Sequence, residues 1–395
     1  METITTCTHM TASDRIALLV SLASRRYLGA VLLLSLGGSA TALAQEPAPR
    51  IPLVTGLVLG SVLHSPLGER EDVIEINRAD TSGVHYDWHE RSITPEGDTT
   101  TGFRKRFVGA GDLAGAPRFD DIFGKDEQIR PGFTALSISS AVYRQLQSAG
   151  TAPFSMIVTP LEARDLTVSG TRIDGILAPL RVRYKGGLTR LSAQPEPFPL
   201  LVNGNRTSVP ALHLKGAFAD GMRRTEWDFW ILADSTHPLV LKSVLLGDVF
   251  QVVRADLPGE LPASAGQLMG ARVMEERLIG KCRLELPGVY FAFGTAAIDP
   301  ISDRALAELA RALAPHPDWT FTVEGHTDSV GTAAANQALS RRRAEAVRAR
   351  LAKRHGLDTH AWGATGYGAT RPRESNATIE GRARNRRVEL VRECH

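Results

Sequence analysis

The chain has 395 residues, of which 43% are hydrophobic and 23% are charged, and its formal net charge is +3. A chain of this length is too long for one hydrophobic core, so we expect about two domains. The small net charge, with only 6% aromatic residues, argues against nucleic-acid binding, which needs a basic surface with stacking side chains.

The N-terminal segment is typical of an export signal. Residues 28–36 form an apolar run that follows two arginines, and residues 42–44 (Ala-Leu-Ala) fit a small-residue cleavage site. The run is too short for a membrane-spanning helix, which needs about 20 apolar residues. We therefore predict a signal peptide over residues 1–44. A start at Met10 or later, and an uncleaved signal anchor, are alternatives.

The next region predicts strands. Several segments alternate apolar and polar residues and are separated by turns containing Gly, Asn or Asp; they are 72–76, 84–90, 180–184, 212–218, 226–232, 239–245 and 249–253. One short helix is expected near residues 139–148. The pattern predicts an antiparallel β-rich domain over residues 45–256, either a sandwich or a partly open barrel.

The role of this β-rich domain stays open. An outer-membrane β-barrel is one alternative, but few aromatic residues are present to build its two girdles. His85, Asp87 and His89 share one face of a predicted strand and could bind a metal. A third or fourth ligand is not evident and no nucleophile motif is present, so we predict no metal, no cofactor and no catalytic residue.

A linker and a connecting helix are predicted over residues 257–281. Residues 257–263 are rich in proline and contain a glycine, as linkers often do. The amphipathic helix that follows has Leu268, Val273 and Leu278 among its apolar positions.

The C-terminal third alternates predicted strands and helices. Residues 319–324 alternate as in a half-buried strand, and apolar residues at helical spacing follow Ser302 and Ser340. Ser302 is a good candidate for the N-cap of the first of these helices. A last strand is predicted at residues 387–391. Strands separated by helices indicate a two-layer α/β sandwich, which we assign to residues 282–395.

An acidic and a basic residue in this region are placed to face one pocket. Asp328 follows the predicted strand, and Arg343 borders the apolar stripe of the next helix. Such a pair suits a zwitterion, because the carboxylate takes an ammonium group and the guanidinium grips a carboxylate through two hydrogen bonds. Singly, Asp328 could merely cap a turn and Arg343 could be a solvated helix charge.

These segments together resemble the OmpA-like peptidoglycan-binding domain. Val289–Phe293 looks like the first strand of that family. The other matching motifs follow in the expected order, at Val323–Asp328, Asn336, Leu339–Ser340, Arg343–Ala344, Gly366–Gly368, Pro372, Asn376 and Gly381–Leu390. The resemblance covers about residues 283–393. It implies that Asp328 and Arg343 hold the zwitterionic end of diaminopimelate in the peptide of the cell wall.

The resemblance also suggests supporting residues. Thr327 and Asn336 would close the pocket, and Arg386 would be a second contact to the ligand carboxylate, although a structural salt bridge at the sheet edge explains Arg386 equally well. His326 lies beside Asp328, but without a nucleophile motif it does not make a catalytic site.

Two cysteines bracket the C-terminal domain. Cys282 precedes its first strand and Cys394 follows its last. In the resembled fold these strands are antiparallel neighbours, which implies a disulfide in an oxidising compartment.

The patterns predict an α+β protein with an N-terminal antiparallel β-rich domain and a C-terminal α/β sandwich, which by resemblance is OmpA-like. The resemblance implies a non-catalytic envelope protein of a Gram-negative cell that binds peptidoglycan without a covalent bond. We expect it in the periplasm, associated with the outer membrane and the wall. A wall-tethered enzyme, a lipid or partner carrier, and a membrane barrel with a wall-binding domain are the alternatives.

Overall fold

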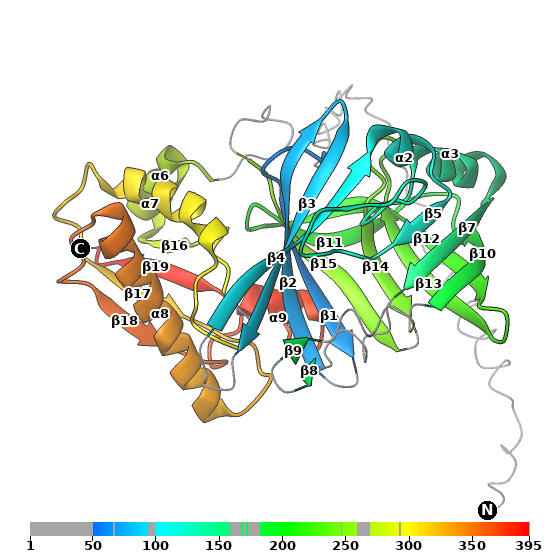
Figure 1. Ribbon diagram of the computed structural model, residues 1–395. Coiled ribbons are helices and arrows are strands. Elements are labelled where there is room, and N and C mark those ends of the chain that lie inside the picture. Colours follow the sequence, from blue (N-terminus) through cyan, green and yellow to red (C-terminus); the bar gives the residue numbers. More distant parts are fainter. Residues whose placement is uncertain are drawn as a thin grey trace, which may run out of the picture. The chain divides into compact units, whose positions relative to one another are not determined.

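Two regions of different architecture follow each other along the chain (Figure 1). The computed structural model describes residues 50–65, 68–93, 99–158, 167–168, 171–172, 182–245, 247–258, 269–291 and 294–394. The predicted signal peptide lies outside these ranges. Within them, no helix has both the length and the apolar character needed to cross a membrane. The prediction of a mixed α+β protein is confirmed.

Strands dominate the first region. Among the described residues, a 13-stranded sheet has the order β5-β7-β10-β12-β13-β14-β15-β1-β2-β3-β4-β6, with β11 paired to both β12 and β15. Strands β11 to β15 therefore close a ring. The strands are β1 (Val58–Ser65), β2 (Gly68–Asp80), β3 (Gly83–Ile93), β4 (Thr99–Gly109), β5 (Arg118–Asp120), β6 (Gln128–Ile129), β7 (Thr151–Val158), β10 (Val182–Arg190), β11 (Glu196–Val202), β12 (Asn205–Ala219), β13 (Arg224–Leu232), β14 (Val240–Leu245) and β15 (Asp248–Asp256).

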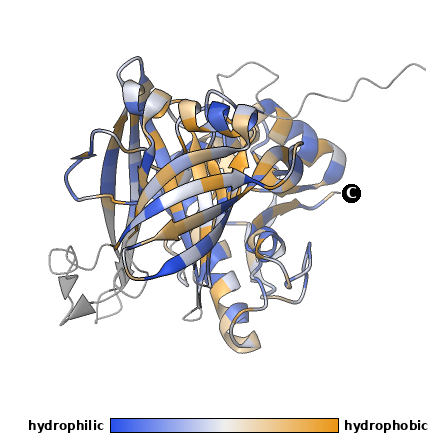
Figure 2. Ribbon diagram, turned by 90° about the vertical axis from the view of Figure 1, so that its right-hand side faces the viewer, coloured by the Kyte–Doolittle hydropathy of each residue, from blue (hydrophilic) through white to orange (hydrophobic). Residues whose placement is uncertain are grey.

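Most neighbouring strands of this sheet are antiparallel, as predicted. Successive side chains of a strand point to opposite faces of the sheet. Because one of these faces is buried, the positions of the apolar residues fix the register in which neighbouring strands pair. On β13, for example, Trp227, Phe229 and Ile231 are buried in the hydrophobic core. Figure 2 shows hydrophobic and hydrophilic residues alternating along these strands. Each predicted strand segment overlaps a strand of the structure, although residues 180–181 lie outside the described ranges.

Short helices and a small hairpin complete the region. The helix predicted near residues 139–148 is α3 (Ser140–Ala149), which begins where the Ser139 hydroxyl accepts a hydrogen bond from Val142 N and ends at Gly150 in the left-handed conformation. The remaining elements are helix α2 (Ala110–Gly115) and strands β8 (Thr167–Val168) and β9 (Thr171–Arg172), which pair with each other.

The second region is a four-stranded sheet of order β16-β19-β17-β18 with helices packed on one face. Apolar residues of α7 and α8 meet Phe321 and Val323 of β17 and Leu390 of β19 in one core. The elements are α6 (Ala271–Lys281), β16 (Arg283–Glu285), η3 (Pro300–Ser302), α7 (Asp303–Leu313), β17 (Phe321–Gly325), α8 (Ala333–His355), β18 (Gly363–Gly366), α9 (Ile379–Asn385) and β19 (Val388–Arg392).

Three details differ from the sequence predictions. The first described strand of this sheet is β16, and residues 289–290 are not in a strand, because Pro287 and Gly288, with φ of 73°, turn the chain before Val289; residues 292–293 lie outside the described ranges. On α6, Met274 and Leu278 are buried, whereas Val273 is 38% exposed. The Ser302 hydroxyl does not cap α7, because it bonds the backbone of Tyr290 instead.

The ends of this second sheet are joined covalently. β16 and β19 pair antiparallel, which brings the residue before β16 beside the residues after β19. In the structure a disulfide links Cys282 to Cys394, whose Cα atoms lie 6.0 Å apart.

Residues 47–395 form one compact unit, so the two regions are in contact. Apolar contacts join β1 and β15 to α9, through Val62, Val253 and Ala383. A second apolar cluster joins Val58 and Val73 to Ile301, with Tyr290 packed against it. These contacts place strand β2 beside the loop that follows β17.

Candidate functional site

The Asp328 loop joins β17 to α8. β17 approaches α8 so closely that a Cβ atom on Gly325 would lie 2.0 Å from the Ser340 carbonyl oxygen. Asp328 Oδ1 accepts a hydrogen bond from Val330 N at 2.9 Å. Asn336 Nδ2 donates to the carbonyl oxygens of Asp328, at 3.2 Å, and Val330, at 3.0 Å. Asn336 therefore fixes the shape of the loop that presents Asp328.

Arg343 reaches the same place from α8 and is only 5% exposed. Its Nε donates to the Thr295 carbonyl oxygen at 2.9 Å, and its guanidinium lies 4.9 Å from the centre of the Phe291 ring. Burial lowers the pKa of Arg343 to about 10, which still leaves it charged at neutral pH. The alternative of a solvated helix charge is therefore wrong for Arg343, whereas the neighbouring Arg341 and Arg342 are exposed.

Arg386 connects Asp328 to the β-rich region. From the end of α9, its Nη1 donates to Asp328 Oδ2 at 2.5 Å and to Glu69 Oε1 at 2.9 Å, while its Nε donates to Glu71 Oε1 at 2.5 Å. Burial opposes the charge of Arg386, but the carboxylates outweigh it and raise its pKa. Arg386 therefore makes a structural salt bridge beside the candidate site, as one of the two interpretations had it. Its role as a contact to the ligand carboxylate stays a prediction.

We call Asp328, Arg343 and Arg386 the Asp–Arg pocket. A cavity adjoins it, with Arg343 and Arg386 in its wall together with Glu71, Arg254, Tyr290 and Phe291. Asp328 lies behind Arg386 and is 7% exposed. Two donor atoms near this place, Thr327 Oγ1 and Arg386 Nη2, are buried and have no hydrogen-bond partner among the described residues. Both atoms are therefore buried donors that lack a partner in the packing of the described residues.

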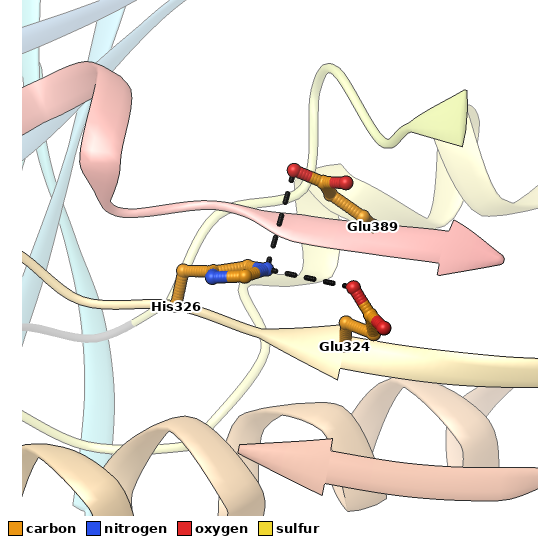
Figure 3. Close-up of side chains that lie close together, drawn as sticks. All are labelled: Glu324, His326 and Glu389. Atoms are coloured by element: carbon orange, nitrogen blue, oxygen red, sulfur yellow. Dashed lines mark ion pairs between the residues drawn. The ribbon is translucent and has the colours of Figure 1, made fainter. Parts of the chain in front are cut away.

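His326 does not face Asp328. It is buried next to Tyr367, and its Nε2 lies 4.0 Å from carboxylate oxygens of Glu324 and Glu389 (Figure 3). The atoms of His326, Glu324 and Glu389 are close enough to surround a metal ion. The carboxylates, however, already accept hydrogen bonds from guanidinium groups.

These guanidinium groups make the cluster an ion-pair network on the second face of the small sheet. Arg283 donates to Glu324 at 2.8 Å and also pairs with Glu389. Arg387 and Arg373 donate to Glu389 at 2.6 and 2.9 Å. Burial and the charge of Arg387 lower the pKa of His326 to about 4, so the ring is neutral at pH 7.

The three polar residues predicted on one face of β3 contact different partners. His85 Nδ1 lies 2.5 Å from Glu127 Oε1, and Asp87 accepts from Asn77. His89 is buried, with Nδ1 3.0 Å from Asp299 Oδ1 in the second region and Nε2 3.6 Å from Glu75.

His89 is a buried ionic contact between the two regions. Burial alone would lower its pKa, but Asp299 and Glu75 together raise it to about 9. Sequence reasoning missed this role, because His89 and Asp299 are 210 residues apart.

Comparisons with known proteins concern the second region. Residues 290–386 match the OmpA family. Outer membrane porin F of Pseudomonas aeruginosa is 48% identical over 101 residues, which are 26% of this chain and 29% of that protein. Peptidoglycan-binding protein ArfA of Mycobacterium tuberculosis is 40% identical over 102 residues, 25% of this chain and 31% of that protein. The match therefore spans about a third of the length of these relatives.

A solved structure also matches about a quarter of this chain. The peptidoglycan-associated lipoprotein from Burkholderia pseudomallei is 32% identical, and the match covers 27% of this chain and 88% of that one, with a TM-score of 0.25. These matches leave the N-terminal β-rich region unassigned.

Proposed function

We propose, from the premise that residues 290–386 form an OmpA family domain, that this domain binds peptidoglycan without catalysing a reaction. The relative ArfA supports the choice of peptidoglycan as the ligand, since that protein is described as peptidoglycan-binding. The chain would then tether its β-rich region to the cell wall. We propose the division into residues 45–256, 257–281 and 282–395 that the sequence suggested.

The ligand group we propose is the zwitterionic end of diaminopimelate in the wall peptide. Its carboxylate would bind Arg343 and Arg386, and its ammonium group would bind Asp328. The observation that carries the proposal is a buried, charged Arg343 in the wall of a cavity that also contains Arg386. Thr327 Oγ1 and Arg386 Nη2 are buried donors without a partner in the described part of the chain, and we propose that they donate to the ligand when it is bound. Asn336 would act indirectly, by holding the Asp328 loop.

The proposed location is the periplasm, in association with the outer membrane and the wall. The relatives that match include an outer membrane porin and an outer membrane protein A. The predicted export signal agrees with this location.

Replacing Arg343 or Asp328 with alanine should weaken binding to purified peptidoglycan. Each variant removes the protein's partner of one charged group of the ligand. Such a loss in a buried site costs roughly 2–5 kcal/mol of binding free energy, which corresponds to about a 30-fold or larger loss of affinity. Co-sedimentation with wall sacculi measures the bound fraction over a series of sacculus concentrations. Arg342→Ala is the matched control, because Arg342 is exposed and adjacent to Arg343 on α8. Undiminished binding of both pocket variants would refute the assignment.

A further inference from the structure

Two glutamates of β2 enter the pocket region. Glu69 Oε1 accepts from Arg386 at 2.9 Å, and Glu69 Oε2 accepts from Arg382 Nε at 3.0 Å. Glu71 Oε1 accepts from Arg386 Nε at 2.5 Å. The side chains of Glu69, Arg382 and Arg386 are nearly buried. These are therefore ion pairs shielded from water, in which each charge depends on its partner.

Arg386, which donates to both glutamates, is also a donor that the wall peptide would need. Arg386 Nη1 is shared between Asp328 and Glu69, so Glu69 stands beside the carboxylate proposed to bind an ammonium group. Glu71 is in the wall of the cavity with Arg343. After burial, which lowers the pKa of Arg343, the charge of Glu71 has the largest effect on that pKa and raises it. Glu71 thus provides a carboxylate to the same two arginines.

The packing around these side chains leaves a wall peptide little access. Arg343 and Asp328 are both buried while β2 is in place. Val62 of β1 and Val253 of β15 pack on Ala383 of α9, three residues before Arg386. A guest that bridges Asp328 and Arg343 would have to displace the β2 carboxylates first.

We propose that Glu69 and Glu71 of β2 are internal occupants of the peptidoglycan site that stand in for the ligand carboxylate, so that the chain binds the wall only after the β-rich region that carries β2 moves away. This inference rests on the proposed function, since it concerns the regulation of the same pocket. The structure then represents the closed state, in which the β-rich region blocks the wall-binding domain.

The closed state lowers the apparent affinity by the fraction of molecules that are open. Further contacts stabilise it, including the ion pairs of His89 with Asp299 and of Arg304 with Glu75. Changes at Glu69 and Glu71 should therefore shift the equilibrium toward the open state without altering the arginines that bind the ligand.

The test uses the full chain with Glu69→Lys and Glu71→Lys together, which places positive charges against Arg382 and Arg386. Co-sedimentation with diaminopimelate-type sacculi should show binding about tenfold tighter, or more, than that of the wild type. Because added positive charge also attracts an anionic wall, the control is Asp126→Lys with Glu226→Lys, the same charge change at two exposed positions. The control measures the gain from charge alone, which should be well below about tenfold; a control that gains as much as the Glu69→Lys, Glu71→Lys chain would overturn the inference. A Glu69→Gln, Glu71→Gln chain, which adds no positive charge, should show a smaller gain and serves if the lysine variant does not fold.

Arg343→Ala in the opened background separates this inference from the proposed function. If the opened chain binds more tightly and Arg343→Ala abolishes that binding, the proposed function and the inference are both supported. Equal binding of wild type and opened chains, lost in both with Arg343→Ala, would leave the function in place and overturn the internal occupancy. Tighter binding that Arg343→Ala does not reduce, or binding by neither chain, would overturn the proposed function and the inference with it.

Discussion

Replacing Cys282 and Cys394 with serine should lower the free energy of unfolding of the OmpA family domain by about 4–5 kcal/mol. The disulfide closes a loop whose ends are 112 residues apart. In the chain-entropy model, a loop of this length strongly restricts the unfolded chain, so its release favours unfolding. Urea unfolding of the oxidised wild type and the double variant measures the difference.

Reduction provides the control for this prediction. Dithiothreitol should destabilise the wild type by about the same amount and should leave the double variant unchanged, since the variant has no bond to break. Mass mapping with and without reductant identifies the bonded pair directly. Two free thiols in the purified, unreduced protein would show that this bond is absent.

Glu389→Gln should cost about 3 kcal/mol of stability at pH 7. The Glu389 carboxyl is fully buried and accepts hydrogen bonds from Arg283, Arg373 and Arg387. Burial alone would raise its pKa, but these guanidinium groups dominate and lower it from 4.5 to about 2. The neutral amide would leave three cations close together without their shared anion.

The same shift predicts a pH dependence. Because the folded-state pKa is below the unfolded one, the stabilisation is present above pH 4.5 and is lost as the pH falls toward 2. Thermal unfolding between pH 2 and 7 should therefore show a weaker acid dependence in Glu389→Gln than in the wild type. Glu393→Gln is the matched control, since Glu393 is exposed just beyond β19 and should change stability by less than about 0.5 kcal/mol. Equal acid profiles for all three proteins would contradict this account of Glu389.

Local patterns explain which parts of the fold were predictable. Alternation located strands such as β13, and a short helix was expected near residues 139–148 where α3 lies, because both signals reside in neighbouring residues. The first strand of the small sheet was misplaced. Val289–Phe293 has an apolar strand-like composition, but residues 289–290 directly follow the turn at Pro287 and Gly288 and are not in a strand.

The nearness of Asp328 to Arg343 was predictable for a different reason. Asp328 and Arg343 are joined by one loop and the start of one helix, so their spacing in the chain constrains their spacing in the fold. Glu69, Glu71 and Arg382 could not be placed in the same way. Arg386 and Glu71 are 315 residues apart, and only the packing of the two regions brings them together.

The same limit applies to charges that a strand pattern places toward solvent. His89 has the alternation of an exposed strand face, yet Asp299 covers it. Glu324 and Glu389 likewise alternate with core residues and are buried, because arginines rather than water solvate them. A strand pattern identifies two faces, and the partner of each face depends on tertiary structure.

The central claim is that the Asp–Arg pocket recognises a zwitterionic amino-acid end. Isothermal titration calorimetry tests this claim most directly. The Glu69→Lys, Glu71→Lys chain is titrated with a soluble stem peptide that ends in meso-diaminopimelate. The comparison peptide ends in lysine, which differs by lacking the side-chain carboxylate that Arg343 and Arg386 would bind. We predict that the diaminopimelate peptide binds at least about 30-fold more tightly. Equal affinities for the two peptides would contradict the account.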